Sequence, residues 1–193
     1  MGTGRLEAFS DGVLAIIITI MVLELKAPHG ESLDTLRPLI PVFLSYLLSF
    51  IYIGIYWNNH HHMLYAARTV SGGVLWANLH LLFWLSLVPF ATAWMGENHF
   101  GATPVALYGV VLFMAGNAYF ILSRALIVHH GEASPLARAV GRDAKGLVSV
   151  AIYALAIALT QLDPAISLGL YVAVAMLWFI PDRRIERIVV RNG

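Results

Sequence analysis

A short polar segment precedes the first apolar run of this 193-residue chain. Ser10 and Asp11 stand before a nearly uninterrupted apolar stretch that extends from residue 12 to residue 23. A carboxylate inside a membrane span is costly unless it is paired, so Asp11 is a candidate functional residue. The alternative is a helix N-terminus, where Ser10 or Asp11 caps the first turn and the acid favours the positive end of the helix dipole. The residue types alone leave both interpretations open.

The third apolar run holds a second group of polar and aromatic residues, which includes Asn78, His80 and Trp84. Polar side chains inside a membrane bundle face protein and form hydrogen bonds between helices. We therefore expect them to be partners of Ser10 and Asp11. The competing hypothesis is a proton relay through Asp11 and His80, which would make the chain a proton-coupled transporter.

Histidine occurs consecutively at residues 60–62 and at residues 129–130, which raises the question of a metal site. Consecutive helical residues point in different directions, and only residues three or four apart converge on one ion. We interpret both runs as solvated helix ends, of which residues 60–62 also sense pH, and we expect no metal and no cofactor.

The motifs of several enzyme and channel classes are missing from the sequence. It contains no Gly-rich phosphate loop, no H-E-x-x-H and no G-x-S-x-G, so we expect no enzyme and no catalytic residue. It also lacks the T-V-G-Y-G carbonyl filter. An ion pathway would therefore be lined by side chains, and nothing in the chain suggests a nucleic-acid partner.

The composition is that of a membrane protein: 59% of the residues are hydrophobic and 12% are charged, whereas a soluble domain carries about 25% charged residues. Each apolar run approaches the ~20 residues that a helix needs to cross a ~30 Å hydrocarbon core. We predict one all-α domain over residues 1–193, a bundle of six transmembrane helices in a lipid bilayer. The expected spans are 9–25, 39–57, 74–95, 104–128, 146–162 and 165–180, with a tight hairpin at residues 161–164.

The distribution of basic residues predicts the orientation. Six spans place both chain ends on one side, and that side carries ten of the twelve Lys and Arg residues. They are Arg5, Arg68, Arg124, Arg138, Arg142, Lys145, Arg183, Arg184, Arg187 and Arg191. Lys26 and Arg37 fall on the other side. Positive residues collect in the cytoplasm, so we expect a cell (inner) membrane protein with both termini inside.

Helical geometry divides the first span into two faces. At about 100° per residue, one narrow stripe forms on this span, and Asp11 lies roughly 140° away from it. The stripe contains Phe9, Ile16, Ile20 and Leu23, with Thr19 at its edge. One face is thus able to line a conduit while Asp11 holds the helix against a neighbour. Because nearly every residue of the span is apolar, the stripe alone does not identify a pore.

The pattern Arg5-x-x-x-Phe9-Ser10-Asp11 at the start of a first apolar span resembles that of the prokaryotic members of the transmembrane protein 175 family, which are relatives of the lysosomal potassium channel. The resemblance covers the whole chain. It includes three features of the third span, namely His80, Trp84 and the pair Pro89-Phe90.

This resemblance implies a homotetramer in which the first helix of each subunit lines a central potassium-permeable pore, with K⁺ as a transient permeant ion. It maps the hydrophobic constriction to Ile16, with Ile20 and Leu23 one and two turns further outward, and it places the hydroxyl of Thr19 near the pore. It also implies a structural network that orients the first helix, formed by Arg5, Phe9, Ser10, Asp11, His80 and Trp84. A structural or sensory membrane subunit is the non-transport alternative.

Overall fold

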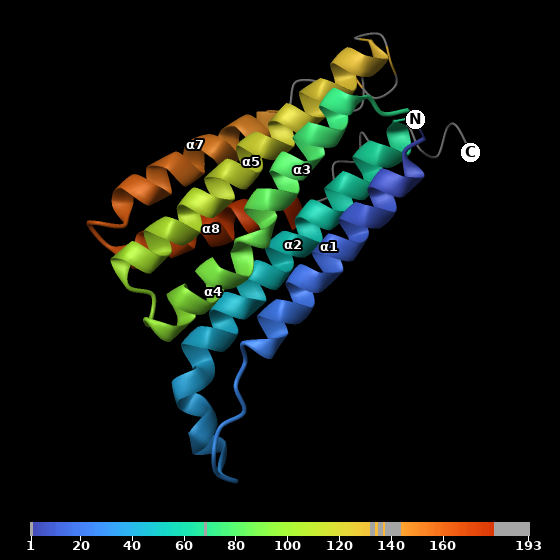
Figure 1. Cartoon of the computed structure of the whole chain (residues 1–193). Helices are drawn as coiled ribbons and strands as arrows, with labels where there is room; N and C mark the ends of the chain where they lie inside the picture. The colour runs from blue at the N-terminus through green and yellow to red at the C-terminus, as the bar shows by residue number, and fades with distance from the viewer. Residues whose placement is uncertain (1, 68, 132–133, 135–136, 138–143, 180–193) are drawn as a thin grey trace.

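The computed structural model describes residues 2–67, 69–131, 134, 137 and 144–179, and these residues form helices and loops without a strand. Figure 1 shows the arrangement. The elements are α1 (Gly4–Leu23), the 3₁₀ helix η1 (Leu33–Leu39), α2 (Ile40–Ala66), α3 (Gly72–Ser86), α4 (Val88–Glu97), α5 (Ala102–His130), α7 (Ala144–Leu159) and α8 (Pro164–Phe179). The predicted all-α bundle is confirmed, and most of the described residues of each expected span lie in a helix.

The start of α1 contradicts one of the two interpretations of the polar segment, the helix N-terminus at Ser10 or Asp11. The helix begins at Gly4, and its N-cap is Thr3, whose side chain makes no capping hydrogen bond. Ser10 and Asp11 therefore lie in the second turn and beyond, so the interpretation of either residue as an N-cap is wrong. Their side chains remain free to contact other helices.

The third expected span is divided into α3 and α4 rather than being one helix. The break falls at Leu87, two residues before Pro89. Proline has no N–H to donate and its ring crowds the preceding turn, which explains the interruption. Thr92 donates a hydrogen bond of 2.7 Å to the carbonyl of Val88 just beyond the break.

Four helical stretches are long and apolar enough to cross a membrane among the described residues: Gly4–Leu23, Leu33–Ala66, Gly72–Glu97 and Ala102–His130. The described parts of α7 and α8 have 16 residues each, or about 24 Å of helix. They form the expected hairpin, in which Asp163 Oδ1 accepts a hydrogen bond from Ala165 N at 2.8 Å. The last residue of the sixth expected span, Ile180, lies outside the described residues.

The helices run roughly side by side, with α5 at the centre of the core. α1 lies beside α2 at one edge, and the α7–α8 hairpin lies on the other side of the bundle (Figure 1). α5 packs against α3, α4, α7 and α8, and it contributes fully buried residues along its length, namely Tyr108, Leu112, Ala115, Ala118, Leu122 and Leu126. α1 packs on α2, α3 and α4, and one of its faces adds Leu6, Leu14, Ile17 and Met21 to the same core.

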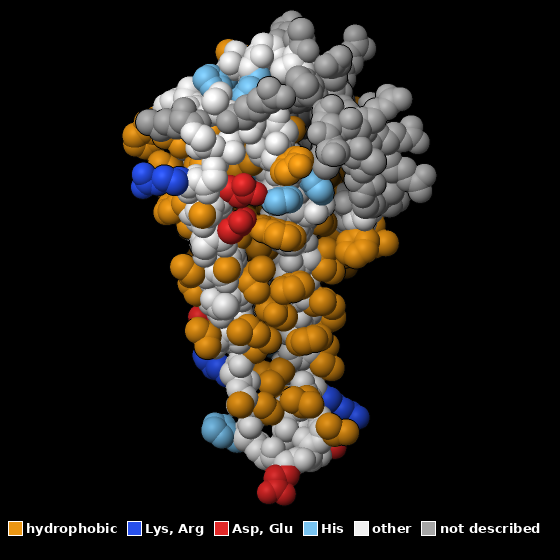
Figure 2. All heavy atoms as spheres, turned by 90° about the vertical axis from the view of Figure 1, so that its right-hand side faces the viewer, with side chains coloured by type: hydrophobic (Ala, Val, Ile, Leu, Met, Phe, Trp, Pro, Cys, Tyr) orange, Lys and Arg blue, Asp and Glu red, His pale blue; other side chains and the backbone are white. Residues whose placement is uncertain are grey.

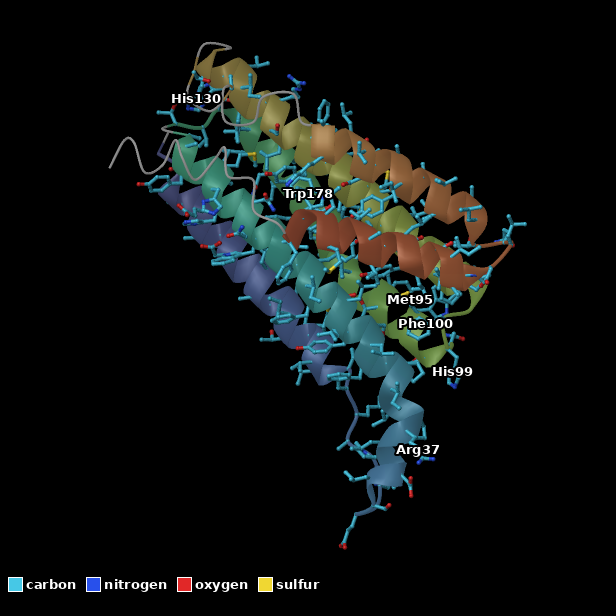
Figure 3. The ribbon with its side chains drawn as sticks, turned by 180° about the vertical axis from the view of Figure 1, so that it is seen from behind. Arg37, Met95, His99, Phe100, His130 and Trp178 are labelled. Carbon is cyan, nitrogen blue, oxygen red and sulfur yellow. The ribbon has the colours of Figure 1, made fainter. Side chains whose placement is uncertain are left out.

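The two ends of the bundle differ in shape and charge. Arg37 lies in the narrow projection formed by η1 and the start of α2, and His130 lies at the opposite end of the molecule (Figure 3). Figure 2 shows the face of α1 and α2, where charged side chains gather toward the two ends of a hydrophobic band. This pattern fits a chain that crosses a bilayer. Seven of the basic residues that predict the orientation lie outside the described residues: Arg68, Arg138, Arg142, Arg183, Arg184, Arg187 and Arg191.

A close approach of α2 and α4 depends on Gly96. A Cβ atom at this position would lie 2.5 Å from Ser45 Oγ and 2.7 Å from the backbone Cα of Val42. Gly96→Ala is expected to lower the free energy of unfolding by about 1–3 kcal/mol, because backbone must move to accept the methyl group. The thermal unfolding midpoint of the detergent-solubilised protein measures this effect.

Gly169→Ala in α8 is the matched control, since no atom lies within 4 Å of its added Cβ. It is expected to leave stability unchanged or to raise it by up to about 1 kcal/mol through helix propensity. Equal unfolding midpoints for the two variants would show that the α2–α4 approach tolerates a side chain.

Candidate pore helix and its polar anchor

One face of α1 packs against the rest of the chain. Its buried residues recur every three or four positions and are Leu6, Ser10, Leu14, Ile17 and Met21. This is the spacing of a single helical stripe. Because four of the five are apolar, Ser10 is the one polar group on the buried stripe and needs a partner there.

The opposite face of α1 is largely left exposed by the described residues. Ile16 is 58% exposed and Leu23 is 78% exposed, and Phe9 and Ile20 are also exposed. Thr19 lies on the same side and donates its hydroxyl to the carbonyl of Ile16 at 2.9 Å. The residues expected from helical geometry to form one stripe therefore do share an exposed face, which in a membrane meets lipid or another copy of the chain.

A buried chain of hydrogen bonds attaches α1 to α2 and α3. Ser10 Oγ donates to the carbonyl of Leu6 at 2.8 Å and accepts from Asn78 Nδ2 at 3.0 Å. Asn78 Oδ1 lies 2.7 Å from His60 Nε2. An amide oxygen only accepts, so His60 donates this bond and carries its proton on Nε2. The three side chains are at most 2% exposed, so the network fixes Ser10 in the interior.

The same tautomer leaves Nδ1 of His60 as an acceptor without a hydrogen-bond partner in the described residues. Buried polar atoms in native proteins are nearly always paired with protein or ordered water. The interpretation of residues 60–62 as a solvated helix end is therefore wrong for His60, which lies between helices.

Two further contacts join α1 to α2 beside the buried network. Trp57 Nε1 donates to Asp11 Oδ1 at 3.1 Å, and His61 Nδ1 lies 2.8 Å from Glu7 Oε1. The rings of Trp57 and His61 stack, with centroids 6.0 Å apart and an angle of 22° between their planes. Asp11 thus holds α1 against a neighbouring helix, as the helical geometry of the sequence suggests.

The structure places the other expected network residues differently. His80 accepts a hydrogen bond of 3.0 Å from Trp84 Nε1 on its own helix, α3, while Asn78 is the α3 residue that reaches Ser10. Arg5 and Phe9 are exposed and line a groove of about 760 Å³ between α1 and α3. Arg5 makes no ion pair with any described residue.

Sequence reasoning missed Glu7 as a contact residue on α1 and Trp57, His60 and His61 as contact residues on α2. A signal for three of them was present in the spacing, since Glu7 and Asp11 are four residues apart, as are Trp57 and His61. Such pairs lie on one face of each helix, but only the packing of α1 on α2 brings the two faces together. In the second histidine run, His129 Nε2 lies 3.1 Å from Thr69 Oγ1.

Comparisons with known proteins match this chain to one family of ion channels. The family described as "Endosomal/lysosomal potassium channel TMEM175" matches residues 5–89. A potassium channel of Chryseobacterium sp. (strain P1-3) is 55% identical over 192 residues, which cover 100% of both chains. The endosomal/lysosomal proton channel TMEM175 of Gallus gallus is 29% identical over 192 residues, and the match covers 90% of this chain but 36% of the chicken protein.

The fold has a relative among solved structures as well. The crystal structure of a lysosomal potassium-selective channel TMEM175 homolog from Chamaesiphon minutus superposes with a TM-score of 0.79 at 27% identity, and the match covers 92% of this chain and 96% of that one. The family model, which matches residues 5–89, covers α1 from its second residue onward, with its exposed stripe and its polar anchor. The chain therefore belongs to the TMEM175 family of membrane ion channels.

Proposed function

We propose that the protein is a passive, potassium-permeable channel in which four copies of the chain place their α1 helices around a central pore. The observation that carries the proposal is the asymmetry of α1. Its buried face is attached to α3 by a polar contact, while its apolar face, with Ile16 58% exposed, is left uncovered by the residues that the structure describes. The relative with 55% identity is named a potassium channel, which supports K⁺ as the permeant ion.

The expected pore has no carbonyl filter, so its lining consists of side chains. Four copies of Ile16 at one level form a hydrophobic ring that narrows the pore until water leaves it, with Ile20 and Leu23 extending this lining outward. A slightly wider ring passes a partly hydrated ion. K⁺ releases its water more readily than Na⁺, and Thr19 adds one hydroxyl per subunit, so we expect modest K⁺ selectivity. Both chain ends lie in the cytoplasm of the cell in this arrangement.

Flux measurements test the proposal. Proteoliposomes with opposed K⁺ and Na⁺ gradients are expected to give a reversal potential displaced toward that of K⁺, with no need for a pH gradient. The detergent-solubilised particle is expected to contain four 21.2-kDa chains. Empty liposomes are the control. Absence of cation flux from a correctly folded particle would favour a structural or sensory subunit instead.

The alternative is a proton-coupled transporter that uses Asp11 and His80. Asp11 is hydrogen-bonded to Trp57 and His80 to Trp84, and the described residues contain no Asp11–His80 hydrogen bond. This arrangement favours the channel. Flux that requires a pH gradient and is lost in Asp11→Asn would favour the transporter.

A further inference from the structure

An aromatic ridge, defined by Trp57, His61 and Tyr65, lies on the side of α2 next to α1. The three residues are spaced by four, so they follow one line along the helix. Their rings contact one another in turn, with centroids 6.0 Å apart for Trp57 and His61 and 6.4 Å apart for His61 and Tyr65. Tyr65 is 62% exposed and Trp57 is 44% exposed. The end of the ridge at Tyr65 is thus left largely uncovered by the described residues.

A groove of about 760 Å³ lies on another side of α1, where this helix faces α3. Its lining is largely apolar and includes Leu6, Phe9 and Leu79. Arg5 is the one charged residue among the described residues of the lining, and it makes no ion pair with any of them. The groove therefore combines an apolar surface with a single guanidinium group.

The groove and the ridge lie on opposite sides of α1. Phe9 lines the groove, whereas Asp11 accepts the hydrogen bond from Trp57 of the ridge. These two residues of α1 are two positions apart, which is about 200° around a helix. No residue of α2 is among the described residues that line the groove. α1 thus separates the two surfaces within one chain.

The groove and the ridge also lie at the same height along α1. The contacts of α1 with Trp57 and His61 show that α2 runs antiparallel to α1, because the residue numbers fall on α2 as they rise on α1. The same register places Tyr65, one turn beyond His61, level with the first turn of α1. That turn contributes Gly4 and Arg5 to the groove.

Equal height matters for copies of the chain arranged around a central axis parallel to α1. A rotation about this axis keeps every residue at its height, so it carries the ridge of one copy toward the groove of the next. A closed ring with head-to-tail contacts needs two different surfaces of this kind, whereas a two-fold contact needs one surface that is complementary to itself. Phe9 belongs both to the groove and to the exposed face of α1, so the groove continues from the proposed pore face.

We propose that the groove binds the aromatic ridge of a second copy of this chain, with the ring of Tyr65 inserted between α1 and α3 of the neighbouring copy. The proposal rests on the pore role of α1 proposed above. The apolar lining accepts the aromatic body of a tyrosine, and its hydroxyl keeps a polar partner available. The guanidinium of Arg5 binds the face of such a ring or donates to its hydroxyl.

An anionic lipid is the competing occupant, since an arginine binds its headgroup and an apolar groove holds its acyl chain. The position of the groove favours a neighbouring chain. Because the groove adjoins the proposed pore face, this side of α1 turns toward the centre of the assembly rather than toward the bilayer.

The chain has no cysteine, so introduced thiols test the contact directly. Tyr65→Cys and Leu79→Cys are placed in separate chains with different tags, which are co-expressed and treated with a short bismaleimide. We expect linked pairs that carry both tags, and none when either variant is expressed alone. Leu147→Cys replaces Leu79→Cys in the matched control. Leu147 is 60% exposed on α7, on the other side of the bundle, so this control should give no linked pairs.

Three outcomes of the linking experiment would overturn the proposal. Links between two Tyr65→Cys chains would indicate a two-fold contact. Equal yields with Leu79→Cys and with Leu147→Cys would indicate random collision. Absence of links, together with an anionic lipid that co-purifies with the wild type and is lost from Arg5→Gln, would assign the groove to a lipid.

A second measurement follows assembly without a linking reagent. We expect the detergent-solubilised particle of Tyr65→Ala to dissociate at about tenfold higher protein concentration than the wild type, because aromatic residues dominate the energy of such contacts. Phe179→Ala is the matched control, since Phe179 is 66% exposed on α8, and it should dissociate like the wild type. Equal dissociation of the two variants would overturn the proposal.

Cation flux in the same preparations separates this proposal from the channel function. Absence of flux from particles in which the ridge and the groove are linked would overturn the channel function and leave the contact in place. Flux of the wild-type protein without links between Tyr65→Cys and Leu79→Cys would overturn the contact and leave the channel function in place.

Discussion

Ile16→Asn is expected to raise K⁺ conductance about tenfold and to move the K⁺/Na⁺ permeability ratio toward one. A ring of four isoleucines excludes water from the constriction, and an amide at the same level holds water there, so the barrier to ion entry falls. A tenfold change corresponds to about 1.4 kcal/mol, a small part of the cost of removing water from an ion. Single-channel or liposome flux recordings with reversal potentials in K⁺/Na⁺ gradients measure both quantities.

Ile166→Asn is the matched control for this variant. Ile166 is 48% exposed on α8, on the hairpin far from α1, so the same substitution places an amide on an apolar surface without entering the proposed pore. We expect its conductance and selectivity to equal those of the wild type. If Ile16→Asn also matches the wild type in both, then Ile16 does not form the constriction.

Asn78→Leu is expected to lower the free energy of unfolding by about 2 kcal/mol. The variant removes the amide that links Ser10 to His60, and it leaves Nε2 of a buried imidazole without its acceptor. An unsatisfied buried donor costs about 1–3 kcal/mol, although hydrogen bonds between membrane helices contribute less on average than this range. The thermal unfolding midpoint in detergent measures the loss, and K⁺ flux should fall with it because α1 loses its buried anchor.

Asn117→Leu provides the comparison. Asn117 is only partly buried, and its amide donates to the carbonyl of Phe113 on its own helix at 2.7 Å, so its loss leaves no other side chain unpaired. The thermal unfolding midpoint of Asn117→Leu should fall by less than half as much as that of Asn78→Leu. Equal midpoints for the two variants would mean that the link between Ser10 and His60 does not stabilise the fold, and that α1 is held mainly by apolar packing.

Changes in ion conduction and changes in the unfolding midpoint are expected to occur separately in Gly96→Ala and Ile16→Asn. Gly96→Ala acts at the contact of α2 with α4, away from the face of α1, so it should lower stability without a change in the permeability ratio. Ile16→Asn lies on an uncovered face and should change permeation while leaving the unfolding midpoint nearly constant. The two kinds of variant therefore separate the residues that hold the bundle from those that line the pore.

The sequence determined the membrane class, the approximate spans and the two-sided character of α1. These properties follow from local information: a run of about 20 apolar residues satisfies its own backbone in a bilayer only as a helix, and the helical period fixes which residues share a face. Positions 16, 20 and 23 fall on one exposed face for this reason. The sequence also contains the signal for the helix break before Pro89. Proline lacks an N–H and its ring crowds the preceding turn, so it ends or kinks a helix in any context.

Only the tertiary structure decided which polar residues meet. Asn78, rather than His80, reaches Ser10, and His60 lies buried although its neighbour His61 is partly exposed. These partners depend on how α2 and α3 are rotated about their axes. That rotation results from packing along the whole length of each helix, so no single sequence motif predicts it. The packing of α1 on α2 likewise brings Glu7 to His61 and Asp11 to Trp57.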